Sequence, residues 1–271
     1  MAGNGRTSVG SVYHSLEEVL SVLKKPEFGI LPEVQQLISI FNSERERCKK
    51  VPQSAASESS KKFPFIVLEG LDGTGKTTVT KKLSKALGAT SRGTPPQCLL
   101  GLRDQFDKHP IQLRRAFYSL GNYIAADEVE VLRFRQPVVM DRFWHSTAAY
   151  AVASEARDGG GSLAEVPAAG DPVYDWPADL LRPDAVLFLD VSEEVRNSRL
   201  SSRAATTPEE DKLKEDRVFR GNLVEVYKRM RNPGTIKIDS NGTIKNVLIE
   251  INTTIQHLTD KCNVSEAISS Q

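Results

Sequence analysis

A glycine-rich stretch between an apolar run and an amphipathic run constrains this chain more than any other feature. Residues 63–69 read FPFIVLE, and this run of β-branched and aromatic side chains stops at Gly70. Residues 70–77 match G-x-x-x-x-G-K-[ST], a pattern whose glycines let backbone N–H groups face an anion. The helical pattern of residues 77–87 points its positive end at the same place. The stretch predicts a phosphate-binding loop between a strand and a helix.

The side chains of this loop indicate which anion it binds. Lys76 supplies a cation for the β- and γ-phosphates, and the Thr77 hydroxyl can bind Mg²⁺. A simple glycine turn between strand and helix would not require this Lys-Thr pair. ATP and Mg²⁺ are therefore the expected ligands. The predicted nucleotide-binding residues are Gly70, Leu71, Asp72, Gly73, Thr74, Gly75, Lys76, Thr77 and Thr78.

Composition and charge narrow the class of protein. The 271 residues are 39% hydrophobic, which suits one large α/β core, although the length also permits two small domains. A formal net charge of +1 provides no global attraction to nucleic acid or to an anionic membrane. No apolar run approaches the roughly 18 residues of a membrane span. Cys48, Cys98 and Cys262 lack C-x-x-C spacing, which argues against a disulfide framework or a zinc site.

The chain divides into three predicted parts. Residues 1–50 contain two amphipathic helices, within residues 12–47, and are expected to form a helical appendage. Residues 51–62, VPQSAASESSKK, are rich in Ser, Ala and Lys, which offer little to pack in a core, and read as a linker. Residues 63–271 are expected to form the nucleotide-binding domain.

Apolar strands alternate with helical patterns throughout this last part. The strands are continuous apolar runs, which is typical of a parallel sheet covered on both faces. We therefore predict a doubly wound α/β domain with helices on both faces of the sheet. Residues 157–170 are expected to form an exposed insertion. The predicted strands are residues 64–69, 138–141, 185–191 and 236–239, with a further strand near residues 98–99.

A carboxylate and a guanidinium follow one of these strands directly. Asp141 and Arg142 end the apolar run PVVM, and the carboxyl ends of neighbouring parallel strands open on one crevice. Asp141 is then a candidate Mg²⁺ ligand, and Arg142 a candidate clamp on a phosphate. The alternative is a surface ion pair just past a strand, which the neighbouring phosphate loop makes less attractive.

An arginine-rich segment follows the strand at residues 185–191. Arg196, Arg199 and Arg203 recur at helical spacing and share a face. A polar stretch and a second helical pattern, residues 218–230, complete the arrangement expected of a lid. A closing arginine stabilises the charge that phosphoryl transfer spreads over the migrating group. The alternative is a solvated helix face.

The helical segment at residues 110–135 mixes cations, rings and an amide. Rings stack on a base, an amide reads its edge, and arginine binds phosphate. A place in the core is the alternative for each ring. The predicted substrate-binding residues are Asp72, Arg114, Tyr118, Asn122, Tyr123 and Arg142.

The motifs EGLDGTGKTT, MDRFWHSTAAYA and RPDAVLFLDVS, with the R-x-x-x-R of Arg199 and Arg203, resemble the thymidylate kinase family of nucleoside monophosphate kinases. The resemblance covers about residues 63–258. It implies a P-loop kinase fold, a five-stranded parallel sheet with a lid, and transfer of a phosphoryl group from ATP to a pyrimidine nucleoside monophosphate. It assigns Lys76 and Thr77 to phosphate and Mg²⁺, Asp72 to the acceptor side, Asp141 and Arg142 to the transfer site, and Arg199 and Arg203 to the lid.

The departures from the family pattern concern the base. Thymidylate kinases carry Phe-x-x-Asn-Arg in the acceptor helix, where this chain has Asn122-Tyr123 and no arginine. They also carry an arginine shortly after a proline in the preceding loop, where this chain has Pro95-Pro96-Gln97. An amide at Asn122 can serve uracil or cytosine. The expected acceptors are therefore UMP, CMP, dUMP and dCMP.

The same motifs are compatible with other functions. A thymidylate kinase or a deoxynucleoside kinase is the alternative among enzymes, and an ATP-binding switch without acceptor phosphorylation is the alternative of another class. The resemblance implies small-molecule nucleotides as partners, suggests a homodimer, and favours mitochondria. The first residues make a poor transit peptide, so the cytoplasm is the alternative location. We expect no partner nucleic acid or membrane.

Overall fold

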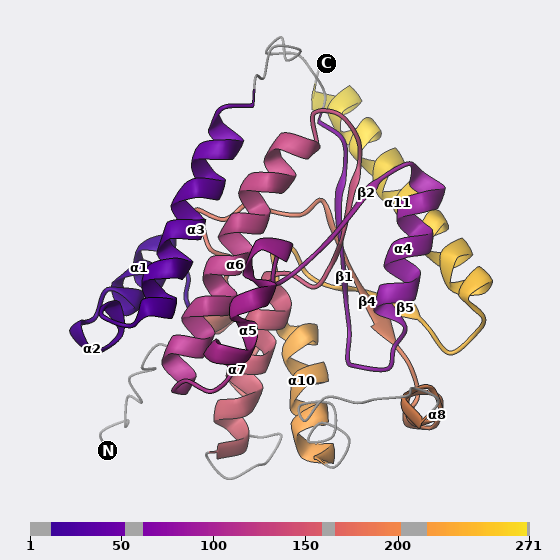
Figure 1. Ribbon diagram of the computed structural model, residues 1–271. Helices are drawn as coiled ribbons and strands as arrows, with labels where there is room; N and C mark the ends of the chain where they lie inside the picture. The colour runs from indigo at the N-terminus through magenta and orange to yellow at the C-terminus, as the bar shows by residue number, and fades with distance from the viewer. Residues whose placement is uncertain (1–11, 52–61, 159–165, 202–215, 270–271) are drawn as a thin grey trace, which may run out of the picture.

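A five-stranded parallel sheet forms the centre of the molecule (Figure 1). The computed structural model describes residues 12–51, 62–158, 166–201 and 216–269. The strand order is β2-β3-β1-β4-β5, and every neighbouring pair is parallel. The predicted doubly wound α/β fold is therefore confirmed. The strands are β1 (Phe65–Glu69), β2 (Thr90–Gly93), β3 (Val138–Asp141), β4 (Ala185–Asp190) and β5 (Ile236–Asp239).

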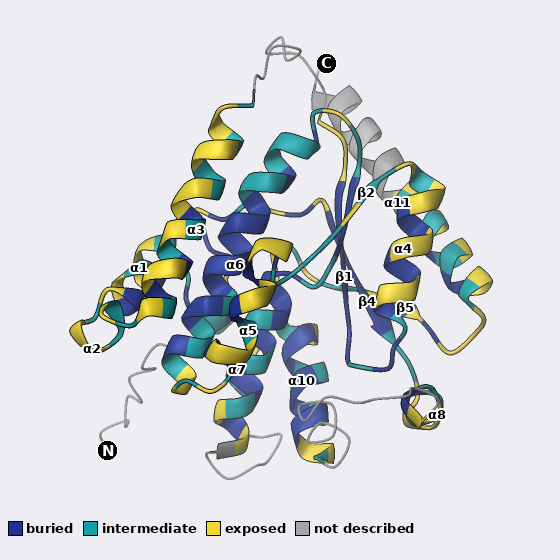
Figure 2. Cartoon of the chain, viewed as in Figure 1, coloured by how far each residue is buried: buried dark blue, intermediate teal, exposed yellow. Residues whose placement is uncertain are grey.

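Helices cover both faces of this sheet (Figure 1). One face packs against α4 (Lys76–Leu87) and α11 (Ile244–Ser269), and the other against α6 (Ile111–Leu132), α7 (Trp144–Asp158) and α10 (Arg217–Arg229). The central strand β1 is buried along its whole length (Figure 2). Its side chains alternate between the two hydrophobic layers, as a pleated strand requires.

Several short helices lie in the connections between the strands. A 3-10 helix, η1 (Gln97–Leu102), leads into α5 (Arg103–Phe106), and a second, η3 (Pro172–Tyr174), precedes β4. The helix α8 (Glu193–Ser201) follows β4 and stands at the carboxyl end of the sheet (Figure 1). Among the described residues no helix is both long and apolar enough to cross a membrane.

The strand predicted near residues 98–99 is wrong. The chain turns at Gly88, which has a left-handed φ of 60°, and enters β2 directly. This strand, with the sequence TSRG, lies at the edge of the sheet and is only partly buried, so it lacks the apolar run of the central strands. The apolar signal further on comes from η1, in which Leu99 and Leu102 are buried three residues apart.

The N-terminal segment forms three helices, α1 (Leu16–Leu23), α2 (Pro26–Gly29) and α3 (Pro32–Lys49). Of these, α1 and α3 lie against α6 on its far side from the sheet, and α2 packs against the other two (Figure 1). Val19 and Leu37 are fully buried in the same hydrophobic cluster as α6. A polar contact also joins the N-terminal segment to the rest of the molecule, since Leu16 N donates to Asp179 Oδ2 at 2.8 Å. One continuous core thus includes these helices, and the division into appendage, linker and catalytic domain stays a prediction.

Leu37→Ala tests this shared core. Removing a fully buried leucine should lower the free energy of unfolding by about 2–5 kcal/mol. Both tryptophans, Trp144 and Trp176, lie outside the N-terminal helices, and Trp144 Nε1 donates to Tyr13 O at 3.5 Å just before α1. Their fluorescence during urea unfolding therefore reports on the rest of the molecule and on its contact with the N-terminal segment. We expect their transition to shift with the mutation.

Ile30→Ala is the matched control, because Ile30 is 74% exposed and its loss should change stability by less than about 0.5 kcal/mol. A tryptophan transition that Leu37→Ala leaves in place would show that the N-terminal helices unfold separately.

Candidate active site

The glycine-rich loop lies between β1 and α4, packed between the end of β4 and helix α8. Gly70 has a φ of 144°, and a Cβ on it would lie 2.8 Å from the Leu189 carbonyl oxygen. Gly73 has a φ of 85°, and a Cβ there would lie 2.9 Å from Leu200 Cγ. Both positions therefore demand glycine for backbone conformation and for space. The loop is held in one shape by its neighbours.

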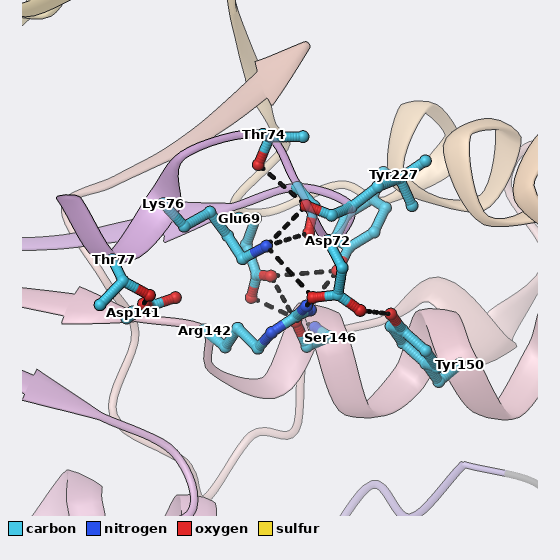
Figure 3. A network of polar contacts seen from close by, with 12 residues as sticks. Glu69, Asp72, Thr74, Lys76, Thr77, Asp141, Arg142, Ser146, Tyr150 and Tyr227 are labelled. Atoms are coloured by element: carbon cyan, nitrogen blue, oxygen red, sulfur yellow. Dashed lines mark hydrogen bonds and ion pairs between the residues drawn. The ribbon is translucent and has the colours of Figure 1, made fainter. Parts of the chain in front are cut away.

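Lys76, the first residue of α4, is buried and folds back over this loop (Figure 3). Its Nζ donates to the carbonyl oxygens of Gly70 at 2.8 Å and Leu71 at 2.7 Å, and lies 3.8 Å from Asp72 Oδ1. Burial, helped by the nearby Arg142 cation, lowers the pKa of Lys76 to about 8. The ammonium group is thus weakly solvated, and its two hydrogen bonds are to neutral carbonyl oxygens, a state in which an incoming anion is favoured.

Thr77 and Asp141 face each other beside the loop (Figure 3). The Thr77 hydroxyl donates to Asp141 Oδ2 at 2.8 Å, and so joins the start of α4 to the end of β3. A hydroxyl and a carboxylate are hard oxygen ligands of the kind that Mg²⁺ accepts. The two groups therefore fit a shared magnesium ion, with substrate phosphates and water as further ligands.

Arg142 occupies an unusual backbone conformation immediately after β3. Its φ of 67° lies in the left-handed region, which is costly for a residue with a side chain. The guanidinium donates to Asp72 Oδ1 at 2.5 Å and to Ser146 Oγ at 3.0 Å, and lies 5.6 Å from the centre of the Tyr150 ring. These contacts hold the side chain over the loop.

A buried carboxylate, Glu69, lies at the centre of a hydrogen-bond network in this region (Figure 3). Glu69 accepts hydrogen bonds from Phe143 N at 2.9 Å, from Ser146 N at 3.2 Å and from the Ser146 hydroxyl, all near the start of α7. The Tyr227 hydroxyl of α10 donates to it at 3.0 Å. Burial raises the pKa of Glu69, while Arg142 and these donors act in the opposite direction. The network joins β1, α7 and α10 at one point.

A cavity of about 380 Å³ opens beside this network. It extends from Asp72 and Arg142 at the loop to Arg114 and Tyr118 on α6. The Tyr118 hydroxyl donates to Asp107 Oδ1 at 2.8 Å and accepts from Arg103 Nε at 3.2 Å. Burial and the Asp107 hydrogen bond raise the pKa of Tyr118 to about 12, so the phenol is neutral. The cavity offers cations at both ends and polar groups between them.

Asn122 and Tyr123 do not line this cavity. Asn122 is buried, and its Nδ2 donates to Thr147 Oγ1 at 3.0 Å. Its Oδ1 has no hydrogen-bond partner in the part of the chain that the structure describes. Thr147 itself lines the cavity, so Asn122 lies behind the wall. Tyr123 donates to Asp179 Oδ1 at 2.7 Å, next to the N-terminal helices. It lies five residues beyond Tyr118, which places it on another face of α6.

The arginines of the predicted lid are placed differently from one another. Arg199 donates to the carbonyl oxygens of Thr74 at 3.0 Å and Ser240 at 2.8 Å, and so joins the phosphate loop to the segment after β5. Arg203 lies outside the described residues, as does most of the polar stretch after it. Thr78, also predicted for the nucleotide, is exposed on the first turn of α4.

Sequence reasoning missed several residues of the site. Ser146 and Tyr150 lie four residues apart on α7, a spacing that places both on one helix face and was readable from the sequence. Glu69 was readable as a carboxylate at the end of an apolar strand. Its partner Tyr227 lies 158 residues away, and no local pattern links the two.

Comparisons with known proteins agree with this geometry. The family model described as thymidylate kinase matches residues 68–251. The human protein "UMP-CMP kinase 2, mitochondrial" is 41% identical over 230 residues, covering 84% of this chain and 48% of that protein. The chain thus spans about half the length of this relative. A thymidylate kinase of Blochmanniella pennsylvanica is 25% identical over 200 residues, covering 69% of this chain and 92% of the relative.

Solved structures share the fold. Thymidylate kinase from Candida albicans superposes with a TM-score of 0.56 at 21% identity, covering 74% of this chain and 93% of that one. A deoxyadenosine kinase from M. mycoides gives a TM-score of 0.51 at 18% identity, over 70% of this chain and 98% of that one. The family match over most of the chain and the phosphate loop at its start lead to one conclusion: the chain belongs to the thymidylate kinase family.

Proposed function

We propose that this protein transfers the γ-phosphoryl group of ATP to a pyrimidine nucleoside monophosphate, namely UMP, CMP, dUMP or dCMP, and releases ADP and the diphosphate. The observation that carries the proposal is the cavity, which runs from the phosphate loop at Asp72 and Arg142 to the polar wall around Tyr118. A phosphate-binding loop beside a cavity for a second nucleotide is suited to phosphoryl transfer. A nucleotide switch would not need such a cavity.

The donor side uses the loop and α4. Its backbone N–H groups and Lys76 would bind the β- and γ-phosphates of ATP, and Thr77 and Asp141 would hold Mg²⁺. The metal ion would neutralise charge on the phosphates when bound. Lys76 would exchange its two carbonyl partners for phosphate oxygens, at little cost because those contacts are to neutral groups.

The acceptor side uses Arg142 and the face of α6. Arg142 would bind the acceptor phosphate, and Asp72 would fix the guanidinium through their contact of 2.5 Å. Arg114 and Tyr118 would face the nucleoside, because both line the cavity one helical turn apart. Asn122 would act through Thr147 and not by direct contact with the base. Arg199 and Arg203 are retained as proposed lid residues.

The human relative supports the choice of acceptor and suggests a location. Its printed name assigns UMP and CMP to that protein and places it in mitochondria. We propose the same nucleotide class and, by the same likeness, a mitochondrial location for this protein. Mg²⁺ as the metal and a homodimer as the assembly are proposals of the same kind.

Incubation with ATP, Mg²⁺ and each of UMP, CMP, dUMP, dCMP and dTMP tests the function. We expect diphosphate from the uridine and cytidine nucleotides and at least tenfold lower kcat/KM with dTMP.

Lys76→Met should lower turnover by more than about 10³-fold, since the cation at the phosphates is lost, while the protein stays folded.

A preference for dTMP would favour a thymidylate kinase, and phosphorylation of deoxyuridine or deoxycytidine in place of their monophosphates would favour a deoxynucleoside kinase. Absence of diphosphate from every acceptor, with slow ATP hydrolysis, would leave an ATP-binding switch.

The lowered pKa of Lys76 predicts proton uptake when ATP binds. At pH 8 about half of the Lys76 side chains are neutral in the ligand-free protein, because the pKa is about 8. Polyphosphate favours the charged form and raises this pKa, so binding takes up protons and ATP affinity falls as pH rises above 8. Calorimetric titration at pH 8 in two buffers of different ionisation enthalpy measures the uptake.

Lys76→Arg is the control for this measurement, because a guanidinium stays charged throughout this range and should take up no proton. Equal binding enthalpies in the two buffers for the unmodified protein would contradict the prediction.

A further inference from the structure

Arg196 of α8 is a buried cation without adequate partners. Its side chain is among the largest fully buried ones, and the residue is 2% exposed. Among the described residues, Nε and Nη1 have no hydrogen-bond partner, and Nη2 has only Asn197 Oδ1 at 3.4 Å. Burial of an unpaired guanidinium is costly, so an anion that reaches it gains a strong partner.

The position of Arg196 beside the phosphate loop indicates that the anion is a phosphate group of the bound nucleotide. A Cβ on Gly73 of the phosphate loop would lie 3.0 Å from Arg196 Cγ and 3.1 Å from its carbonyl oxygen. The arginine therefore packs directly against the phosphate loop at Gly73, the residue after Asp72. The shape of the loop at Gly73 is partly set by this contact.

The carboxylates around Arg196 are already engaged. Glu193, on the same helix, accepts from Arg220 Nε and Nη2, each at 2.8 Å. Asp72 is in contact with Arg142. Burial lowers the pKa of Arg196 and Arg220 acts in the same direction, whereas Glu193 and Asp72 raise it. The described carboxylates near Arg196 therefore leave its Nε and Nη1 without a hydrogen bond.

A purely structural role does not explain these features. A leucine or methionine fills a buried site beside a glycine without leaving two N–H groups unpaired, so packing alone would favour an apolar residue. Arg199, one turn further on, shows the structural alternative, since its guanidinium binds the carbonyl oxygens of Thr74 and Ser240. Arg196 makes no comparable contact.

We propose that Arg196 is a catalytic residue whose guanidinium binds the phosphoryl group as it passes from donor to acceptor. The inference rests on the proposed function. An oxygen lone pair of the acceptor phosphate forms the new bond to the γ-phosphorus. The bond from that phosphorus to the β,γ-bridging oxygen breaks, and its electron pair leaves with ADP. Nε and Nη1 of Arg196 donate to the equatorial oxygens, where negative charge is spread in the transition state.

Arg196→Met and Arg196→Lys test the proposal in the full chain. We expect kcat of the Met variant to fall about 10³-fold, with KM for ATP changed less than threefold, since the contact forms chiefly in the transition state. The Lys variant should recover at least tenfold of that loss. Ligand-free Arg196→Met should melt at the same temperature as the unmodified protein or higher, because an unpaired buried charge is removed.

Arg92→Met is the matched control, because Arg92 pairs with Glu128 at 2.9 Å on the edge strand β2 and does not line the cavity, so its loss should leave kcat unchanged. A kcat of Arg196→Met within threefold of the unmodified protein would overturn the proposal. So would a lowered melting temperature with lost turnover that Arg196→Lys does not recover, since this pattern indicates packing.

Binding of ADP with aluminium fluoride, a mimic of the transferring group that needs no acceptor, separates this inference from the proposed function. Arg196→Met should weaken the mimic at least 100-fold and ADP alone less than threefold. Loss of the mimic by the variant would support the anion contact even if no pyrimidine monophosphate proves to be a substrate. Equal affinities for the mimic in the variant and the unmodified protein would overturn the role of Arg196 by itself.

Discussion

The site depends on one buried carboxylate. Glu69 ends the central strand, accepts two backbone N–H groups at the start of α7, and binds the Tyr227 hydroxyl of α10. Burial of a carboxylate is costly unless several donors surround it, and here the positive end of a helix is among them. Ser146 carries the arrangement outward, because it donates to Glu69 and accepts from Arg142. The charge at the acceptor end is therefore positioned from the middle of the sheet.

The same arrangement explains why Arg142 keeps a strained backbone. A residue with φ of 67° after β3 turns its side chain back over the phosphate loop, where Asp72 and Ser146 bind it. An arginine in an ordinary extended conformation would continue along the strand direction. The strain is sustained because contacts on both sides determine the conformation.

Much of the fold and part of the site followed from local sequence. The phosphate loop, the central strands and the helices after them were predictable, because glycine spacing and apolar periodicity are set by neighbours in the chain. The edge strand β2 was not, since its partly exposed residues carry no apolar run. Tyr123 was assigned to the acceptor from its type, whereas the face of α6 on which it lies decides its partner, Asp179. Glu69 and Tyr227 meet only through the tertiary fold.

The N-terminal helices explain why the outer face of α6, the face turned away from the sheet, carries apolar side chains. In this chain that face is covered, and Tyr123 and Ala126 are buried on it. A relative that lacks such helices must place polar side chains at the equivalent positions or cover them with another chain. Alignment of the catalytic segment alone would record these apolar residues as substitutions without a cause. Their pattern can instead identify, from sequence, which family members possess the same helical cover.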